Sequence, residues 1–306
     1  MLKTSIRHPT AMTRFFVFAL SFVFSACLNL VAAAPSPAAN ETLFRLSDLS
    51  MADTTHLLTD MKTADVVLLG EIHDNRRHHE LRAQLLGNPE FKGRNVVAEH
   101  LDAGQTVGAG DSVLSRLEQA GFDAKGWQWP MHQVLFDAVL TQQMPLYGGN
   151  LPKAQAREAF KTRGNSLPAS MQAVLLRAPL DETGLKQLRQ EIDEGHCGAL
   201  PGMLFEGMMA VQRARDAAMS EQLLQHLPSV LLSGNGHAWK HLGVPQIIRA
   251  TRPELRTLSV LFLEHEPFTD ATAQTEWLRH WQDKADYIWV TPAATREDPC
   301  LSLQKK

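Results

Sequence analysis

Short apolar runs alternate with segments of helical spacing along this chain, and that alternation constrains the fold more than any other feature. The apolar runs lie at residues 65–70, 95–99, 144–150, 230–234, 258–263 and 287–290. Each has the length and composition of a strand that is buried on both faces. Residues 75–86, 112–120 and 131–142, between the first three runs, have helical spacing instead. Strands that alternate with helices predict an α/β fold, with a doubly wound, mostly parallel sheet and flanking helices.

A long stretch in the middle of the chain lacks strand signals. Residues 151–227 contain two long helical patterns, at 181–193 and 203–224. We therefore predict that a smaller helical insertion domain at 151–227 interrupts an α/β domain made of residues 43–150 and 228–306.

The first 34 residues have the composition of an export signal. Basic residues precede an apolar stretch that ends in small residues, as in a secretory signal. Cleavage after residue 34 fits, and so does a lipoprotein cut that removes 1–26 and leaves Cys27 as the lipidated first residue. A membrane-spanning helix is the further alternative. We expect an exported protein, periplasmic or lipid-anchored to the bacterial outer membrane through Cys27, with residues 35–42 as a linker.

The charge of the mature chain excludes one class of partner. Either cut removes three basic residues and no acidic ones, which moves the net charge from −3 to −6. An acidic chain without a basic stripe does not suit nucleic acid. Cys197 and Cys300 can form a disulfide in an oxidising compartment, and the sequence contains no zinc-type cysteine cluster.

Polar residues follow four of the predicted strands at their carboxyl ends. Glu71 and His73 follow the first strand, Glu99 ends the second, residues 148–150 end the third and His237 follows the fourth. Ligands of open parallel sheets bind beyond this edge. The sequence therefore predicts a polar cleft there.

Two chemistries fit these strand-end residues. Glu71 and His73 are two positions apart, so in an extended segment their side chains point the same way. A carboxylate beside an imidazole can act as a general base with its orienting partner, or as two ligands of a divalent metal ion. The alternative is that these groups cap helices and satisfy one another. His78 and His79, which continue into the first helix, are interpreted as part of a solvated helix face.

The predicted insertion has a different character, because a histidine in it is followed closely by several methionines. His196 precedes a helical stretch that contains Met208 and Met209. These residue types are axial ligands of haem iron, although methionines at helical spacing also occur as ordinary core residues. The two tyrosines of the chain, another type of haem ligand, are Tyr147 and Tyr287.

Several motifs resemble, in order, those of the ChaN-type haem-binding lipoproteins. They are residues 66–75 (VVLLGEIHDN), 97–100 (VAEH), 150–153 (NLPK), 212–219 (QRARDAAM), 233–237 (SGNGH) and 243–245 (GVP). The resemblance implies a parallel-sheet domain with a small helical domain, and an envelope lipoprotein with a part in haem and iron uptake.

The resemblance also implies a cofactor and partners. Family members are thought to hold haem between two subunits, with a tyrosine on the iron and a histidine near the propionates. This implies a homodimer around haem and contact with an outer-membrane uptake machinery. The candidate haem-contacting residues are Tyr147, His132, His196, Met208 and Met209, and His132 is expected to be an exposed ligand before a helix.

The wider Tiki-like superfamily, which the chain also resembles, offers a second function. It includes metal-dependent proteases and erythromycin-esterase-like hydrolases that work with Glu and His at strand ends. On that interpretation Glu71, His73, Glu99 and His237 are catalytic residues or ligands of a divalent metal ion, and the protein is a hydrolase of esters or peptides. A scaffold that merely retains this site is the third alternative.

Overall fold

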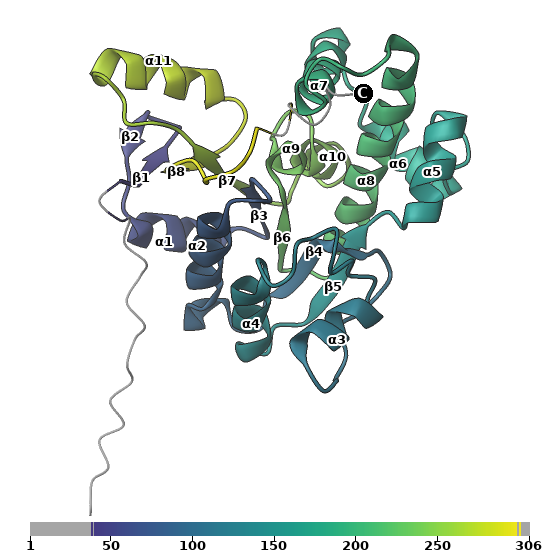
Figure 1. Cartoon of the computed structure of the whole chain (residues 1–306), viewed down its shortest axis with the longest axis horizontal. Helices are drawn as coiled ribbons and strands as arrows, with labels where there is room; N and C mark the ends of the chain where they lie inside the picture. Colours follow the sequence, from purple (N-terminus) through teal and green to yellow (C-terminus); the bar gives the residue numbers. More distant parts are fainter. Residues whose placement is uncertain (1–37, 39, 299, 301–306) are drawn as a thin grey trace, which may run out of the picture. The chain divides into compact units, whose positions relative to one another are not determined.

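The central element of the fold is an eight-stranded sheet (Figure 1). In the computed structural model, which describes residues 38, 40–298 and 300, the strands follow the order β2-β1-β8-β7-β3-β6-β4-β5. Their bounds are β1 Thr42–Arg45, β2 Ser50–Met51, β3 Val66–Glu71, β4 Asn95–Asp102, β5 Leu146–Asn150, β6 Ser229–Gly234, β7 Thr257–Glu264 and β8 Tyr287–Thr291. The strands from β8 to β5 pair in parallel, whereas β1 pairs antiparallel with β8 and β2. Every strand expected from the sequence is present, and the predicted α/β class is confirmed.

Helices cover both faces of this sheet (Figure 1). Their bounds are α1 Thr54–Thr63, α2 Arg76–Leu86, α3 Val113–Gln119, α4 Gln133–Thr141, α5 Lys153–Thr162, α6 Ala169–Arg177, α7 Glu182–Gly195, α8 Phe205–Gln225, α9 Asn235–Ala238, α10 Val244–Thr251 and α11 Ala271–Trp281. Apolar side chains of α1 to α4 form one core with the first face of the sheet. Those of α8 to α11 form a second core with the other face.

The alternation of side chains along β3 shows why its sequence is apolar throughout. Val67 and Leu69 point into the core beneath α1 to α4, whereas Val66 and Leu68 point into the core beneath α8 to α11. All six residues of β3 are buried. Glu71 continues the series of Val67 and Leu69, because successive side chains of a strand point to opposite faces. Its carboxylate therefore lies on the α2 and α4 side of the sheet.

The predicted helical insertion corresponds to α5 through α8. Helices α5, α6 and α7 pack around α8, and α8 packs on β4, β5 and β6. Its small side chains Ala214, Ala217 and Ala218 form a third apolar cluster with residues of α5, α6 and α10. Helix α8 thus belongs to the cover of the sheet as well as to the insertion. The domain boundaries at residues 151 and 227 stay a prediction.

The amino-terminal side of the fold differs from the sequence interpretation. The end of the predicted linker 35–42 is wrong, since Thr42 begins β1 and the buried Glu41 pairs with Arg77 of α2 at 2.6 Å. A strand of four residues gives too short a pattern to be recognised. The signal 1–34 and the lipidation site Cys27 lie outside the described residues.

Two further features concern the covalent structure and the helices. A disulfide joins Cys197, in the segment after α7, to Cys300 near the end of the chain, in agreement with the expectation that they can pair. Among the helices of residues 38, 40–298 and 300, none has the length and apolarity needed to span a bilayer.

Candidate functional site

The turn that follows β3 is held in place by α2, β7 and β8. The amide of Asn75 donates to Glu264 at the end of β7 over 2.6 Å. The backbone N–H of Ile72 donates to His78 Nδ1 over 3.1 Å, and Nε2 of the same ring lies 2.9 Å from Thr291 Oγ1 of β8. These hydrogen bonds fix the backbone that carries the site residues at the end of β3.

His78 and His79 are buried, so the interpretation of a solvated helix face is wrong. Both side chains are 0% exposed, while Arg76 on the same helix is exposed. The reason is that α2 turns these rings toward the polar end of β3, where backbone groups, Thr291 and Arg82 offer hydrogen-bond partners. Burial lowers the pKa of His78 to about 3 and that of His79 to about 4, so both rings are neutral at pH 7.

Glu71 lies at the centre of a buried group of histidines, here called the Glu71 cluster. Its atom Oε1 is 2.9 Å from His73 Nδ1, 3.4 Å from His100 Nε2 and 3.7 Å from His132 Nε2. The cluster also contains His79 and Arg82, which contact the other carboxylate oxygen, Oε2. Four elements, β3, α2, β4 and the start of α4, thus place side chains around one carboxylate.

Arg82 orients the carboxylate of Glu71, and His79 in turn accepts from Arg82. Arg82 is fully buried; it pairs with Glu71 Oε2 and donates to the Leu69 carbonyl over 3.3 Å. His79 Nε2 lies 3.0 Å from the His73 carbonyl oxygen, which only a donor satisfies, so Nδ1 of the neutral ring accepts from Arg82. Oε1 is therefore left facing the other three imidazoles.

Two imidazoles of the Glu71 cluster lack hydrogen-bond partners. His100 and His132 are 2% and 1% exposed, and neither ring nitrogen of either residue is hydrogen-bonded within the described part of the chain. Burial lowers the pKa of His132 to about 2 and that of His100 well below its usual range, since neighbouring cationic groups add to the effect. Each unsatisfied buried polar group lowers the stability of the folded state by about 1–3 kcal/mol. This arrangement therefore destabilises the protein unless a ligand binds to the free nitrogens.

A second group of charged residues lies on the opposite face of the sheet, below α8 and α9. His237 Nδ1 is 2.6 Å from Asp216 Oδ1, and its Nε2 is 3.4 Å from Glu99 Oε1. Burial alone would lower the pKa of His237, but the two carboxylates raise it to about 10. The ring is therefore cationic at pH 7. We call Glu99, His237 and Asp216 the His237 cluster.

His73 connects the two clusters at the edge of the sheet. Its Nδ1 contacts Glu71 and its Nε2 lies 3.8 Å from Glu99 Oε2, while its side chain is 40% exposed. Gly234 makes this position possible, because a Cβ there would lie 2.8 Å from His73 Nε2. His73 is thus the solvent-accessible group between two buried carboxylates.

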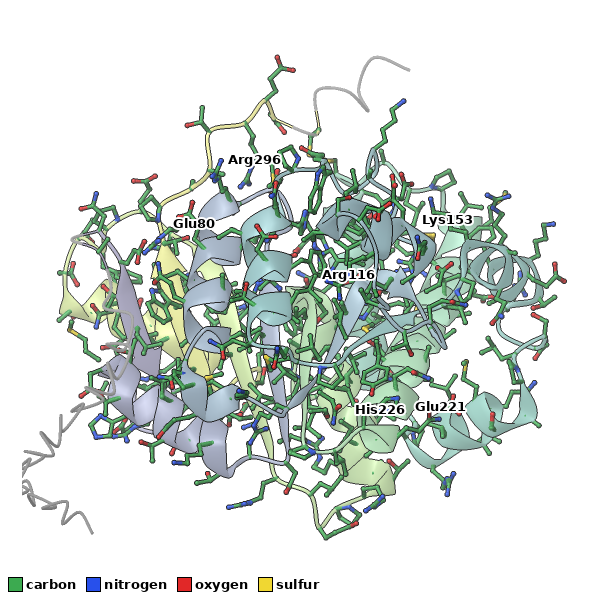
Figure 2. All side chains as sticks on the ribbon, turned by 90° about the horizontal axis from the view of Figure 1, so that it is seen from below. Glu80, Arg116, Lys153, Glu221, His226 and Arg296 are labelled. Carbon is green, nitrogen blue, oxygen red and sulfur yellow. A yellow bond between two sulfur atoms is a disulfide. The ribbon has the colours of Figure 1, made fainter. Side chains whose placement is uncertain are left out.

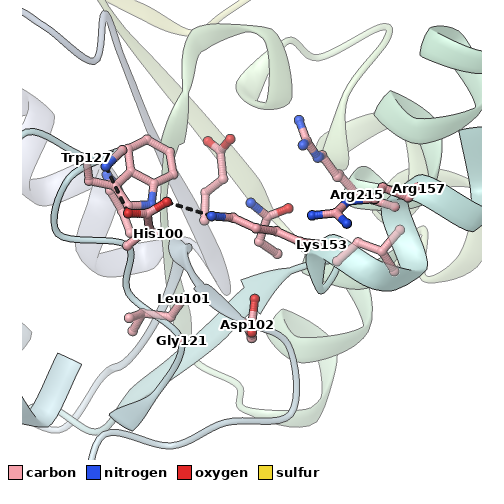
Figure 3. A pocket seen from close by; sticks show the side chains of 14 residues that line it. His100, Leu101, Asp102, Gly121, Trp127, Lys153, Arg157 and Arg215 are labelled. Atoms are coloured by element: carbon pink, nitrogen blue, oxygen red, sulfur yellow. Dashed lines mark hydrogen bonds and ion pairs between the residues drawn. The ribbon is translucent and has the colours of Figure 1, made fainter. Parts of the chain in front are cut away.

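A cavity of about 410 Å³ opens beside the clusters (Figure 3). Trp127 and His100 lie together on one side of it, with ring centroids 4.4 Å apart, and Glu99 also lines it. Lys153, Arg157 and Arg215 stand on the other side. Asp102 and Asp123 also line the cavity, and Asp123 pairs with Lys153 at 2.6 Å, so the aromatic wall faces a surface of mixed charge.

The four residues predicted to form the strand-end site are close together but divided between the clusters. Glu71 belongs to one, and Glu99 and His237 to the other, with His73 between them. Sequence reasoning missed the site roles of Arg82 and Asp216, two charged residues on helices. The spacing of His79 and Arg82, three apart on one helix face, was a signal for the first.

The predicted haem-contacting residues lie in several places. His132 is buried against Glu71 and is not exposed as expected. Tyr147 stacks on His226 at a centroid distance of 3.6 Å. Arg296 pairs with Asp74 beyond β3, and His226 lies on the opposite side of the molecule from Arg296 (Figure 2). Tyr147 is therefore far from the end of β3 that carries the clusters.

The other tyrosine is also engaged within the fold. Tyr287 is buried, and its hydroxyl donates to Asp60 of α1 over 2.7 Å. Burial and that carboxylate raise the pKa of the hydroxyl.

His196 and Met208 share a cavity of about 290 Å³ in the predicted insertion, and Met209 is on the same helix but does not line this cavity. The Nδ1 atom of His196 lies 2.6 Å from the Ile192 carbonyl oxygen. Only a donor satisfies that oxygen, so Nε2 of the neutral ring keeps the lone pair that binds a metal.

The protein is an α/β protein with helices on both faces of a parallel sheet and with histidine–carboxylate clusters at the carboxyl edge of that sheet. Comparison with known proteins gives its family. The profile described as "Haem-binding uptake, Tiki superfamily, ChaN" matches residues 57–248. The chain belongs to this family, which confirms the resemblance noted in the sequence.

One solved structure agrees with the assignment at the level of the fold. The chain is similar to the structure described as cofacial heme binding to ChaN of Campylobacter jejuni, with a TM-score of 0.65 and 16% identity over 84% of this chain and 99% of that one. A Bacillus cereus protein gives a TM-score of 0.45 at 12% identity, over 81% and 91% of the two chains. No curated protein matches the chain.

Proposed function

We propose that this protein binds haem in the bacterial cell envelope and takes part in haem and iron uptake. The observation that carries the proposal is membership of a haem-binding uptake family over residues 57–248. The similar ChaN structure from Campylobacter jejuni holds haem cofacially. The composition of the first 34 residues supports export, with Cys27 as the anchor on the lipoprotein alternative.

The cavity beside α7 and α8 is our candidate for the haem site. Within the described residues Nε2 of His196 makes no hydrogen bond, and Met208 lines the same cavity with apolar side chains such as Leu188 and Trp239. Five large apolar side chains are well exposed in the described residues, and Leu176, Leu185 and Met203 of these lie within 151–227. A porphyrin needs such an apolar surface.

The size of this cavity favours binding between two subunits. Its volume of about 290 Å³ is at the lower end of the usual range for small-molecule sites, about 300–1,000 Å³. A porphyrin would remain partly outside it, and a second copy of the chain, or an uptake partner in the outer membrane, would cover the exposed face.

A hemin titration of the purified chain tests the proposal. The expected result is a shifted Soret band that His196→Ala abolishes and that Tyr287→Phe, a change beside α1, leaves intact. Sedimentation with and without hemin should show a haem-dependent dimer. If substitution of Tyr147, Tyr287, His132 and His196 together leaves the spectrum unchanged, the ligand assignment is wrong; if wild type gives no shift, the haem function is wrong.

A hydrolase of esters or peptides is the second candidate, and the position of His73 favours it. The ring is partly exposed between Glu71 and Glu99, so it can accept a proton from a water molecule while a carboxylate stabilises its charge. Ester and peptide hydrolysis with and without divalent metal ions tests this function. Glu71→Gln and His73→Ala should abolish turnover, and unchanged turnover in both would exclude the mechanism.

A further inference from the structure

We propose that Glu71, His73, His100 and His132 form a binding site for one divalent transition-metal ion of the zinc class. The inference concerns a different place from the haem cavity and does not depend on haem binding. It also differs from the set expected from the sequence, because His100 and His132 replace Glu99 and His237.

The positions of the donor atoms carry the first step. One donor atom from each of the four side chains lies within 4.8 Å of every other. The distances from Glu71 Oε1 to the nitrogens of His73, His100 and His132 are 2.9, 3.4 and 3.7 Å. A zinc ion about 2.0–2.1 Å from each donor would set tetrahedral neighbours roughly 3.3 Å apart. The four side chains thus already surround a space of the right size.

The unpartnered imidazoles point to a ligand independently of these distances. His100 and His132 are almost completely buried, and all four of their ring nitrogens lack a hydrogen bond within the described residues. The rings pack against each other with centroids 4.6 Å apart. A metal ion would use one nitrogen of each ring. Core histidines that serve packing alone normally find a donor or an acceptor.

Surrounding side chains orient the donors as in known metal sites. Arg82 pairs with Oε2 of Glu71, which leaves Oε1 directed at the three rings. Bound histidines and carboxylates commonly depend on such outer partners. Three imidazoles with one carboxylate suit zinc, and also iron, cobalt or nickel, better than calcium or magnesium.

The site also has a balancing charge and an access route. Two buried carboxylates lie close to the proposed metal ion: Glu71, and Glu99 on the other side of His73. Their negative charge offsets the positive charges of the metal ion and of Arg82. His73 is 40% exposed, and His100 with Trp127 lines the cavity of about 410 Å³. An ion can therefore reach the donors from solvent without unfolding of the chain.

The set expected from the sequence is less suitable because His237 is already engaged. Its Nδ1 is 2.6 Å from Asp216 and its Nε2 faces Glu99 at 3.4 Å, so the two ring nitrogens have acceptors. His237 therefore serves as an internal cation that holds Glu99.

Metal titration of the full chain tests the site without any measurement of activity or haem. After EDTA treatment and buffer exchange, Zn²⁺ is titrated against a chromophoric chelator, and Co²⁺ binding is followed by its d–d absorption. Wild type should bind one ion per chain. His100→Ala and His132→Ala should each weaken binding by at least ~10-fold, whereas His237→Gln and the exposed His56→Asn should bind like wild type.

Circular dichroism and urea denaturation establish that each variant is folded. Failure of wild type to bind one Zn²⁺ or Co²⁺ overturns the proposal outright, even if every variant fails to fold. The proposal is also wrong if folded His100→Ala and His132→Ala bind the metal ion as tightly as wild type. It is likewise wrong if His237→Gln is the one variant that loses metal binding. A hemin titration of His132→Ala keeps the two functions apart: a normal Soret shift together with weakened metal binding is the expected result.

Discussion

Replacement of His78 by asparagine is expected to change how the stability of the protein depends on pH. The ring is fully buried, and it accepts a hydrogen bond from the Ile72 N–H while facing the hydroxyl of Thr291. Burial lowers its pKa from 6.5 to about 3; the charge of Glu264 acts in the opposite direction, and that of Arg296 lowers the pKa further. The neutral ring therefore contributes stability above pH 6.5, and that contribution is lost as the pH falls toward 3.

The magnitude follows from one proton taken up on unfolding. Between pH 6 and pH 4 the unfolded chain binds a proton at His78 and the folded chain does not, so this residue adds about 1.4 kcal/mol per pH unit to the slope. In His78→Asn the amide oxygen can still accept from Ile72, but the partner of Thr291 is lost. That loss costs about 1–3 kcal/mol at pH 7.5. The two stability curves should therefore converge on acidification and cross about one to two pH units below 6.5.

Urea denaturation followed by tryptophan fluorescence, in EDTA and at half-unit steps from pH 4.5 to 7.5, measures both curves. His56→Asn is the matched control for a histidine-to-asparagine change, because this side chain on α1 is exposed and lies outside both clusters. Parallel curves for wild type and His78→Asn would refute the assignment of a buried neutral ring at this position.

Further predictions concern the site and the covalent link. Arg82→Leu should lower the free energy of unfolding by about 3–5 kcal/mol, because Glu71 keeps a buried charge without its guanidinium partner; a loss below about 1 kcal/mol in urea denaturation would contradict that pairing. Gly234→Ala should weaken Zn²⁺ binding by at least ~10-fold, since its Cβ would displace His73, while the Soret response to hemin is retained. The disulfide spans 103 residues; the loop-entropy model gives about 4–5 kcal/mol for this length. Dithiothreitol should therefore lower the melting temperature of wild type but not that of Cys300→Ser, and equal responses would count against the link.

The order of strands and helices was largely predictable, because burial on both faces leaves a clear mark on each parallel strand. Residues 65–70 could hardly be anything but an interior strand, and β3 occupies Val66–Glu71. The pairing of Glu71 with His73 was also predictable from their two-residue spacing, and the two side chains lie 2.9 Å apart. Strand β1 was missed, since four residues beside a predicted linker carry too little pattern.

Residues that come to the site from helices could not be predicted in the same way. The contribution of a helix depends on its rotation about its own axis and on its distance from the sheet, and both are set by packing across the whole core. His79 and Arg82 look like surface residues of a charged helix, yet they are buried, because Glu71 pairs with Arg82 and the His73 carbonyl accepts from His79. Charged residues of a helix usually face solvent, but a buried residue of opposite charge can offset the cost of burying them.

The division of the predicted site into two clusters follows from the pleat of β4. Glu99 and His100 are adjacent, so their side chains leave the strand on opposite faces: Glu99 contacts His237 beneath α9, and His100 contacts Glu71 beneath α4. A strand that ends in two polar residues thus supplies one group to each layer, and His73, in the turn beyond β3, is the group that reaches both. Since the sequence expectation placed all four strand-end residues in one set, it overlooked this division. A shift of one residue in the register of β4 would exchange the two groups between the layers, so the bulge recorded between Ala98 and Asp102 lies where such a shift would decide the chemistry.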